Sequence, residues 1–142
     1  MHTLRVSLVL AVAGALGLAN AQTSPDIASL TEKAQAGDRE AQFQLAVAFD
    51  YGRGVVKDQR EAMRWYRSAA ELGLPEAQNS LGSILQVEKK YEDARTWYER
   101  AAVQKHAYAT NNLAYMYDMG LGVAQSRQMA HELYVQSAEL VS

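Results

Sequence analysis

Apolar and polar residues follow one another along most of the chain with the spacing of amphipathic helices. The segments 40–49, 76–85 and 108–117 share an alanine, a leucine four residues later, a small residue beside it and an apolar residue three further on. Offsets of four, five and eight residues lie on one face of a helix, so each segment is predicted to be a helix with one buried face. We name these segments A helices. The two prolines, Pro25 and Pro75, stand where helices can begin.

A second pattern recurs in the segments 62–73, 94–105 and 130–141, which we name B helices. Each begins with alanine, continues with Trp-Tyr or Leu-Tyr, and then carries two small residues. The A helices recur after 36 and then 32 residues, and the B helices after 32 and then 36. The second copy is therefore four residues shorter, between its A and B helices. The residues expected to build the repeat are Ala41, Leu45, Gly52, Gly54, Trp65, Tyr66, Ala69, Ala70, Leu81, Trp97, Tyr98, Ala101, Ala102, Leu113, Gly120, Gly122 and Tyr134.

The first and third copies join their helices by the same loop, Gly-x-Gly-Val, at residues 52–55 and 120–123. Glycine-rich loops that bind phosphate follow a strand, whereas a predicted helix precedes this loop. We therefore interpret the loops as turns in which glycine ends the A helix with a positive φ. Asp58, with Glu61 three residues later, is predicted to cap the B helix that follows.

These residues together resemble the Sel-1-like repeat, a helical hairpin related to the tetratricopeptide repeat. The first copy matches nearly throughout, the second lacks the glycine loop, and the third has Leu133 in place of tryptophan and Ser137 in the alanine pair. The resemblance covers about residues 25–142. It implies an all-α fold: a short right-handed α-solenoid of about three helical hairpins plus a leading helix.

The predicted boundaries follow from the repeat. The leading helix is expected at 25–36, and the repeats at about 38–73, 74–105 and 106–141. One hairpin cannot bury its apolar stripe alone, and about three stacked copies are needed for a stable core. Residues 22–142 are therefore expected to form one repeat domain.

Residues 1–21 have the features of a secretory signal peptide. Arg5 precedes an uncharged apolar run from Val6 to Leu18, and Ala-Asn-Ala at 19–21 fits a cleavage site. The run is shorter than the roughly 20 residues that a membrane-spanning helix needs. We expect cleavage before Gln22, a mature protein without a membrane span, and a periplasmic or secreted location.

The composition excludes disulfides, thiolate metal sites and a cysteine nucleophile, because the chain has no cysteine. The formal net charge of −2 gives no basic excess for binding nucleic acid. His106 and His131 do not have the spacing of paired metal ligands and are expected to be exposed polar residues, and no serine lies in a nucleophile motif. We predict no catalytic, cofactor or metal site.

A binding groove is the remaining candidate site. In related repeats the A helices line the concave side, and the same offsets in each copy define a surface beside the buried stripe. Its residues are Phe43, Val47, Asp50, Tyr51, Asn79, Ser83, Gln86, Val87, Tyr108, Asn111, Tyr115, Asp118 and Met119. Aromatic ends suggest protein or peptide recognition, and two aspartates without a lysine favour a neutral or basic partner segment. The alternative is that Phe43 and Tyr115 pack on neighbouring helices.

The resemblance and the absence of a catalytic set favour a non-enzymatic scaffold or adaptor that binds a protein or peptide in the cell envelope. One alternative is an exported hydrolase of cell-wall or β-lactam substrates, although the relatives with that activity are cysteine-rich. Another is an accessory subunit that is stable only with its partner. Terminal repeats usually need a polar cap, and Leu133, Tyr134 and Leu140 are expected to be partly exposed. Self-association through this uncapped C-terminal repeat is a further expectation.

Overall fold

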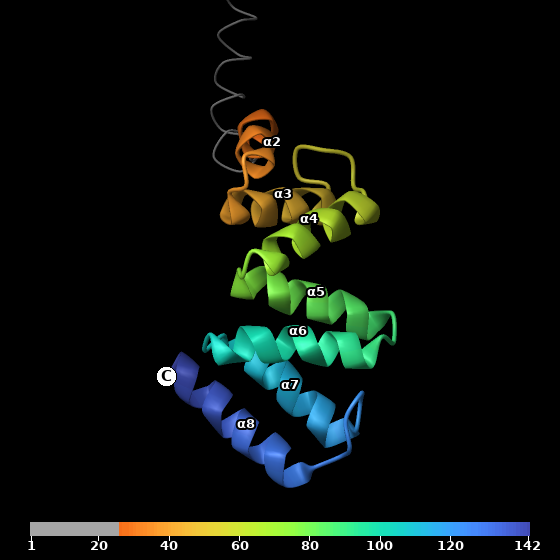
Figure 1. Ribbon diagram of the computed structural model, residues 1–142, viewed down its shortest axis with the longest axis vertical. Coiled ribbons are helices and arrows are strands. Elements are labelled where there is room, and N and C mark those ends of the chain that lie inside the picture. Colours follow the sequence, from red (N-terminus) through yellow and green to blue (C-terminus); the bar gives the residue numbers. More distant parts are fainter. Residues whose placement is uncertain (1–25) are drawn as a thin grey trace, which may run out of the picture.

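The computed structural model describes residues 26–142, and this part of the chain forms seven helices and no strand. The helices are α2 (Ile27–Gln35), α3 (Arg39–Tyr51), α4 (Gln59–Glu71), α5 (Pro75–Val87), α6 (Tyr91–Val103), α7 (Ala107–Met119) and α8 (Arg127–Val141). Each helix packs against the one before it and the one after it, so the helices stack along one long axis (Figure 1). The predicted all-α repeat solenoid is confirmed. The expected signal peptide lies outside the described residues.

The predicted A helices are α3, α5 and α7, and the predicted B helices are α4, α6 and α8. The leading helix α2 has Asp26 as its N-cap, and the Asp26 carboxylate accepts a hydrogen bond from the Ser29 N–H at 3.2 Å. Pro25, where this helix is expected to begin, lies outside the described residues. None of the described helices is long and apolar enough to cross a membrane.

The two glycine loops have the same backbone geometry. Gly52 and Gly120 both lie at φ 66° and ψ 41°, the left-handed conformation that a residue without Cβ adopts at little cost. Gly54 and Gly122 also have positive φ. Asp58 caps α4 by accepting two backbone N–H bonds from its first turn, at 3.0 and 3.1 Å. The interpretation of these loops as turns is confirmed.

Most of the expected repeat residues lie in the core. Those that are buried are Ala41, Leu45, Trp65, Tyr66, Ala69, Ala70, Leu81, Trp97, Tyr98, Ala101 and Leu113. Ala102 is partly buried, as are Leu133, Tyr134 and Leu140 at the C-terminal end of the stack. One core cluster joins α2, α3 and α4, a second runs from α4 to α7, and Phe43 packs against both. The partial exposure predicted for α8 is confirmed, whereas self-association stays a prediction.

Gly82 shows how closely the second hairpin is packed. It takes the place of Ala46 and Ala114 in the other A helices, and a Cβ at Gly82 would lie 2.6 Å from Cε1 of Tyr98. Heavy atoms cannot approach so closely, and the Tyr98 ring is fully buried. The second repeat therefore has glycine here because the aromatic ring of its own B helix occupies the space that a methyl group would need.

Buried glutamines connect successive repeats. Gln42 of α3 donates through Nε2 to the carbonyl of Ala34 at 3.0 Å, and Gln78 of α5 donates to that of Ala70 at 3.2 Å. Each bond reaches from an A helix to the C-terminal end of the preceding helix, where carbonyl groups lack partners within the helix. The amide oxygen of Gln78 also has a partner, because Gln104 Nε2 donates to Gln78 Oε1 at 3.0 Å.

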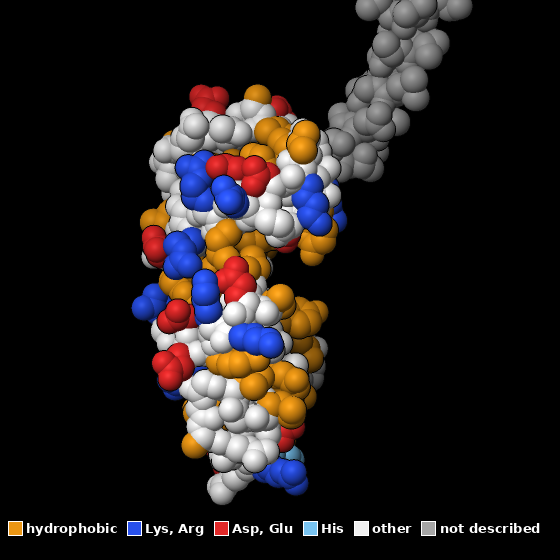
Figure 2. Space-filling model, turned by 90° about the vertical axis from the view of Figure 1, so that its right-hand side faces the viewer, with side chains coloured by type: hydrophobic (Ala, Val, Ile, Leu, Met, Phe, Trp, Pro, Cys, Tyr) orange, Lys and Arg blue, Asp and Glu red, His pale blue; other side chains and the backbone are white. Residues whose placement is uncertain are grey.

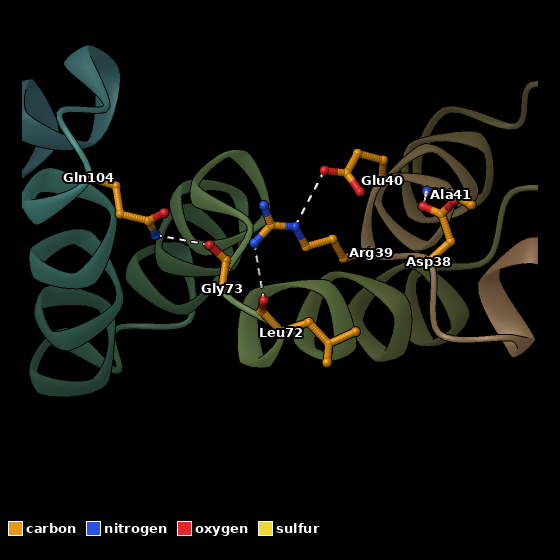
Figure 3. Close-up of polar contacts among 7 residues, drawn as sticks. All are labelled: Asp38, Arg39, Glu40, Ala41, Leu72, Gly73 and Gln104. Atoms are coloured by element: carbon orange, nitrogen blue, oxygen red, sulfur yellow. Dashed lines mark hydrogen bonds and ion pairs between the residues drawn. The ribbon is translucent and has the colours of Figure 1, made fainter.

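Two side chains, one from α3 and one from the end of α6, donate hydrogen bonds to carbonyl groups just after α4. Arg39 donates through Nη1 to the carbonyl of Leu72 at 3.2 Å, and Gln104 donates to the carbonyl of Gly73 at 2.9 Å (Figure 3). Leu72 stands at the position of repeat one that Gln104 occupies in repeat two. Since leucine has no donor, Oε1 of the buried Gln42 has no hydrogen-bond partner among the described residues.

We expect Leu72→Gln to raise the free energy of unfolding by about 0.5–1.5 kcal/mol, because the new amide can donate to Gln42 Oε1 as Gln104 donates to Gln78. Leu72 is 49% exposed, so little apolar burial is lost. Urea unfolding measures the change. In a Gln42→Leu background the same substitution should give no gain, and an equal gain in both backgrounds would contradict the explanation.

Candidate binding groove

Two of the A helices, α5 and α7, come into contact through a side-chain hydrogen bond. Asn112 of α7 donates through Nδ2 to Oδ1 of Asn79 on α5 at 2.9 Å. Phe43 and Val47 of α3 face inward and pack against the core, and the Phe43 ring centroid lies 5.8 Å from that of Tyr66. For Phe43 the structure therefore shows the packing alternative rather than a free groove side chain.

Four of the predicted groove residues line one pocket between α3, α4 and α5. They are Asp50, Tyr51, Asn79 and Ser83, and they are joined by Tyr66, Ser80 and Ile84. The pocket holds about 240 Å³, less than the roughly 300–1,000 Å³ of sites for small molecules and cofactors. A pocket of this size suits one side chain of a partner.

Asp50 supplies the charge of this pocket. Its carboxylate accepts hydrogen bonds from the Tyr66 hydroxyl at 3.1 Å and from Gln59 Nε2 at 2.9 Å. Burial, and then the negative charge of Asp50, raise the pKa of Tyr66 far above its usual value, so its hydroxyl remains a donor. Both donors are neutral, and no lysine or arginine forms an ion pair with Asp50 within the described residues.

The second repeat has a neutral version of the same arrangement. The Tyr98 hydroxyl donates to Gln86 Oε1 at 2.9 Å and lies 3.2 Å from Ser83 Oγ. In the third repeat the charge of Asp118 contributes, after burial, to a raised pKa of Tyr134. The predicted groove residues Asp50, Gln86 and Asp118 are thus at one repeat position, each beside the tyrosine of the following B helix.

The last residue of each A helix is apolar and exposed. Tyr51 is 66% exposed, Val87 84% and Met119 55%, and the three occupy the same repeat position. We name these three residues the apolar ridge. Figure 2 faces the side on which the A helices end and shows hydrophobic side chains gathered below a hollow in the surface. Tyr115, 41% exposed, lies one helical turn before Met119.

The remaining predicted residues are more scattered. Asn111 is exposed, but Tyr108 stands at the other end of α7, 11 residues before Met119 and about 16 Å from it along the helix. Sequence reasoning missed Tyr66, Ser80 and Ile84, which line the pocket from α4 and from a second flank of α5. The recurrence of the B-helix tyrosine beside an A-helix acceptor was the available signal.

The histidines do not form a site. Among the described residues, no group of three or more His, Cys, Asp or Glu side chains is placed to hold a metal ion. His106 is partly buried and caps α7, with its Nδ1 accepting a hydrogen bond from the Ala109 N–H at 3.2 Å. Burial lowers the pKa of His106, which favours the neutral ring that this cap requires. The expectation that His106 is an exposed residue was wrong, whereas His131 is exposed.

Comparison with known proteins places the repeats in a family. The family model described as Sel1 repeat matches residues 39–74, 75–106 and 107–142. A solved Sel1 repeat protein from Oxalobacter formigenes is 37% identical, with 82% of this chain and 91% of that chain covered and a TM-score of 0.74. A protective antigen present in uropathogenic Escherichia coli strains, with an SLR fold, is 31% identical over 80% of this chain and 25% of that chain, with a TM-score of 0.75.

Two curated relatives are much longer proteins. Chitin synthase regulatory factor 3 of Schizosaccharomyces pombe is 31% identical over 110 residues, which are 72% of this chain and 12% of that protein. The ERAD-associated E3 ubiquitin-protein ligase component HRD3 of Candida glabrata is 31% identical over 109 residues, 76% of this chain and 13% of that protein. The chain thus spans about an eighth of the length of these relatives.

Proposed function

The chain belongs to the Sel1 repeat family, and we propose that it is a scaffold or adaptor of the cell envelope that binds a protein or peptide on its A-helix side. Sel1 repeat proteins are in general protein-interaction and adaptor scaffolds, and the two curated relatives are named as a regulator and a ligase component. Neither name describes a hydrolase, which supports a non-enzymatic role over that of an exported hydrolase.

The observation that carries the proposal is the apolar ridge beside the Asp50 pocket. Large apolar side chains recur here at one repeat position and stay exposed. Aromatic and apolar side chains next to a side-chain-sized pocket are typical of surfaces that bind peptides or proteins. The envelope location rests on the signal-peptide pattern of residues 1–21.

Photo-cross-linking in the producing cell tests both parts of the proposal. A benzophenone amino acid is placed at Val87 or Tyr115, and at Arg67, an exposed residue of α4, as the control. We expect discrete protein adducts from positions 87 and 115 and none from position 67, and mass spectrometry of the adducts should find a chain that begins at Gln22. Identical adducts from all three positions, no adducts at all, or a chain that retains residues 1–21 would count against the proposal.

A further inference from the structure

We propose that the groove binds a partner segment with one lysine or arginine side chain in the Asp50 pocket and apolar side chains against the apolar ridge beside it. This inference rests on the proposed function and specifies the chemistry of the partner. Three observations carry it: the uncompensated carboxylate, the apolar walls of its pocket, and the exposed apolar ridge.

The pocket fits a long cationic side chain. Such side chains lay their alkyl stem along apolar surface and place the charged head beside an acceptor. The Tyr51 ring and Ile84 supply apolar walls, and the Asp50 carboxylate supplies the acceptor. The nearby Arg53 guanidinium is 5.1 Å from the centroid of the Tyr51 ring and forms no ion pair with Asp50.

The second repeat lacks the charge of the Asp50 pocket. Gln86 takes the place of Asp50, so the equivalent position at the end of α5 is neutral and already accepts from Tyr98. A basic side chain therefore gains an ion pair beside α3 that it cannot gain beside α5. Asp118 carries the same charge at the end of α7, so an Asp118→Asn variant is needed to separate the two positions.

The apolar ridge gives the partner segment a second kind of contact. Val87 ends α5 and is 84% exposed. It lies one helical turn after Ser83 and Ile84, which line the Asp50 pocket. Apolar side chains next to the basic residue of the partner can therefore lie against Val87.

NMR titration of the isotope-labelled chain with synthetic ten-residue peptides tests the inference. The first probe carries one lysine flanked by leucines, with glycine and serine elsewhere. Matched probes replace the lysine by norleucine or glutamate, or replace the leucines by serine. The protein variants are Asp50→Asn and Val87→Ser, with two controls: Asp118→Asn at the equivalent position of α7, and Asp93→Asn, which changes an exposed carboxylate on α6.

We expect the lysine probe to bind, with shifted amide signals at the C-terminal ends of α3 and α5. Asp50→Asn should weaken it about tenfold and leave the norleucine probe unchanged, because only the lysine gains from the charge. Val87→Ser and the loss of the leucines should each weaken binding, whereas Asp118→Asn and Asp93→Asn should not. In Asp50→Asn the amide oxygen can still accept from Gln59 Nε2, and the new NH2 group can donate to the Tyr66 hydroxyl oxygen, so we expect folding to be retained.

The inference is overturned if the glutamate or norleucine probe binds as tightly as the lysine probe, if Asp50→Asn has no effect, or if no probe binds. These outcomes leave the proposed function standing when positions 87 and 115 still cross-link to a partner. Loss of those cross-links, by contrast, removes the proposed function whatever the peptides do.

Discussion

Replacement of Trp65 by alanine is expected to lower the free energy of unfolding by about 3–5 kcal/mol. The Trp65 side chain is 8% exposed and lies in the cluster that joins α4 to Ala34, Ala41 and Leu45 of the two preceding helices. Repeats in a solenoid contact only their neighbours, so the loss falls on the one interface that holds the N-terminal helices in place. A change of this size is a large fraction of the stability of a small domain.

Urea unfolding followed by circular dichroism gives the free energy, and Trp65→Leu is the matched control. The chain itself has leucine at this position in its third repeat, Leu133. Leucine retains part of the buried volume, so the control should lose clearly less than the alanine variant. The Arg64 guanidinium lies 4.7 Å from the Trp65 ring centroid. Both variants remove the Trp65 ring, so both lose this contact equally. An unchanged unfolding midpoint for Trp65→Ala would show that Trp65 is not part of the core.

The repeat fold could be predicted because its signal is local. Offsets of four, five and eight residues define a buried face within one helix, and the unequal spacings of 36 and 32 residues located the shorter second hairpin. There the turn between α5 and α6 has no glycine, and Lys89 takes the positive φ of 61° instead. The sequence did not indicate which residue of this turn has a positive φ. Lysine adopts a positive φ only where neighbouring contacts compensate the energetic cost.

The groove was predicted only in part because its geometry depends on pairs of helices. Phe43 has the same helical offset as the pocket residue Asn79, yet it packs against Tyr66 and the core. The difference lies in side-chain size and in the neighbouring helix, which periodicity within one helix does not report. Gly82 is a similar case. The repeat pattern requires only a small residue at this position, and alanine is excluded by the Tyr98 ring, which lies where its Cβ would be.

Gly122→Ala is expected to lower the free energy of unfolding by about 2–5 kcal/mol, because two costs add. Gly122 has a φ of 64°, where a side chain costs roughly 1–2 kcal/mol. In addition, a Cβ at Gly122 would lie 2.6 Å from the carbonyl carbon of Tyr91 and 2.8 Å from the backbone nitrogen of Glu92. These are backbone atoms at the start of α6, so a side-chain rotation cannot relieve the overlap, and overpacking of this kind costs about 1–3 kcal/mol.

Gly120→Ala is the matched control, because it separates the two costs within the same loop. Gly120 has nearly the same φ, 66°, but a Cβ there would come no closer than 3.3 Å to Gln125 Cβ. It should therefore lose about 1–2 kcal/mol, the backbone cost alone. The difference between the two variants measures how firmly the loop of the third repeat rests on the second. Equal losses in urea unfolding would mean that the loop moves away from α6 at little cost, and that the Gly-x-Gly loop serves the turn within its own hairpin rather than the contact between repeats.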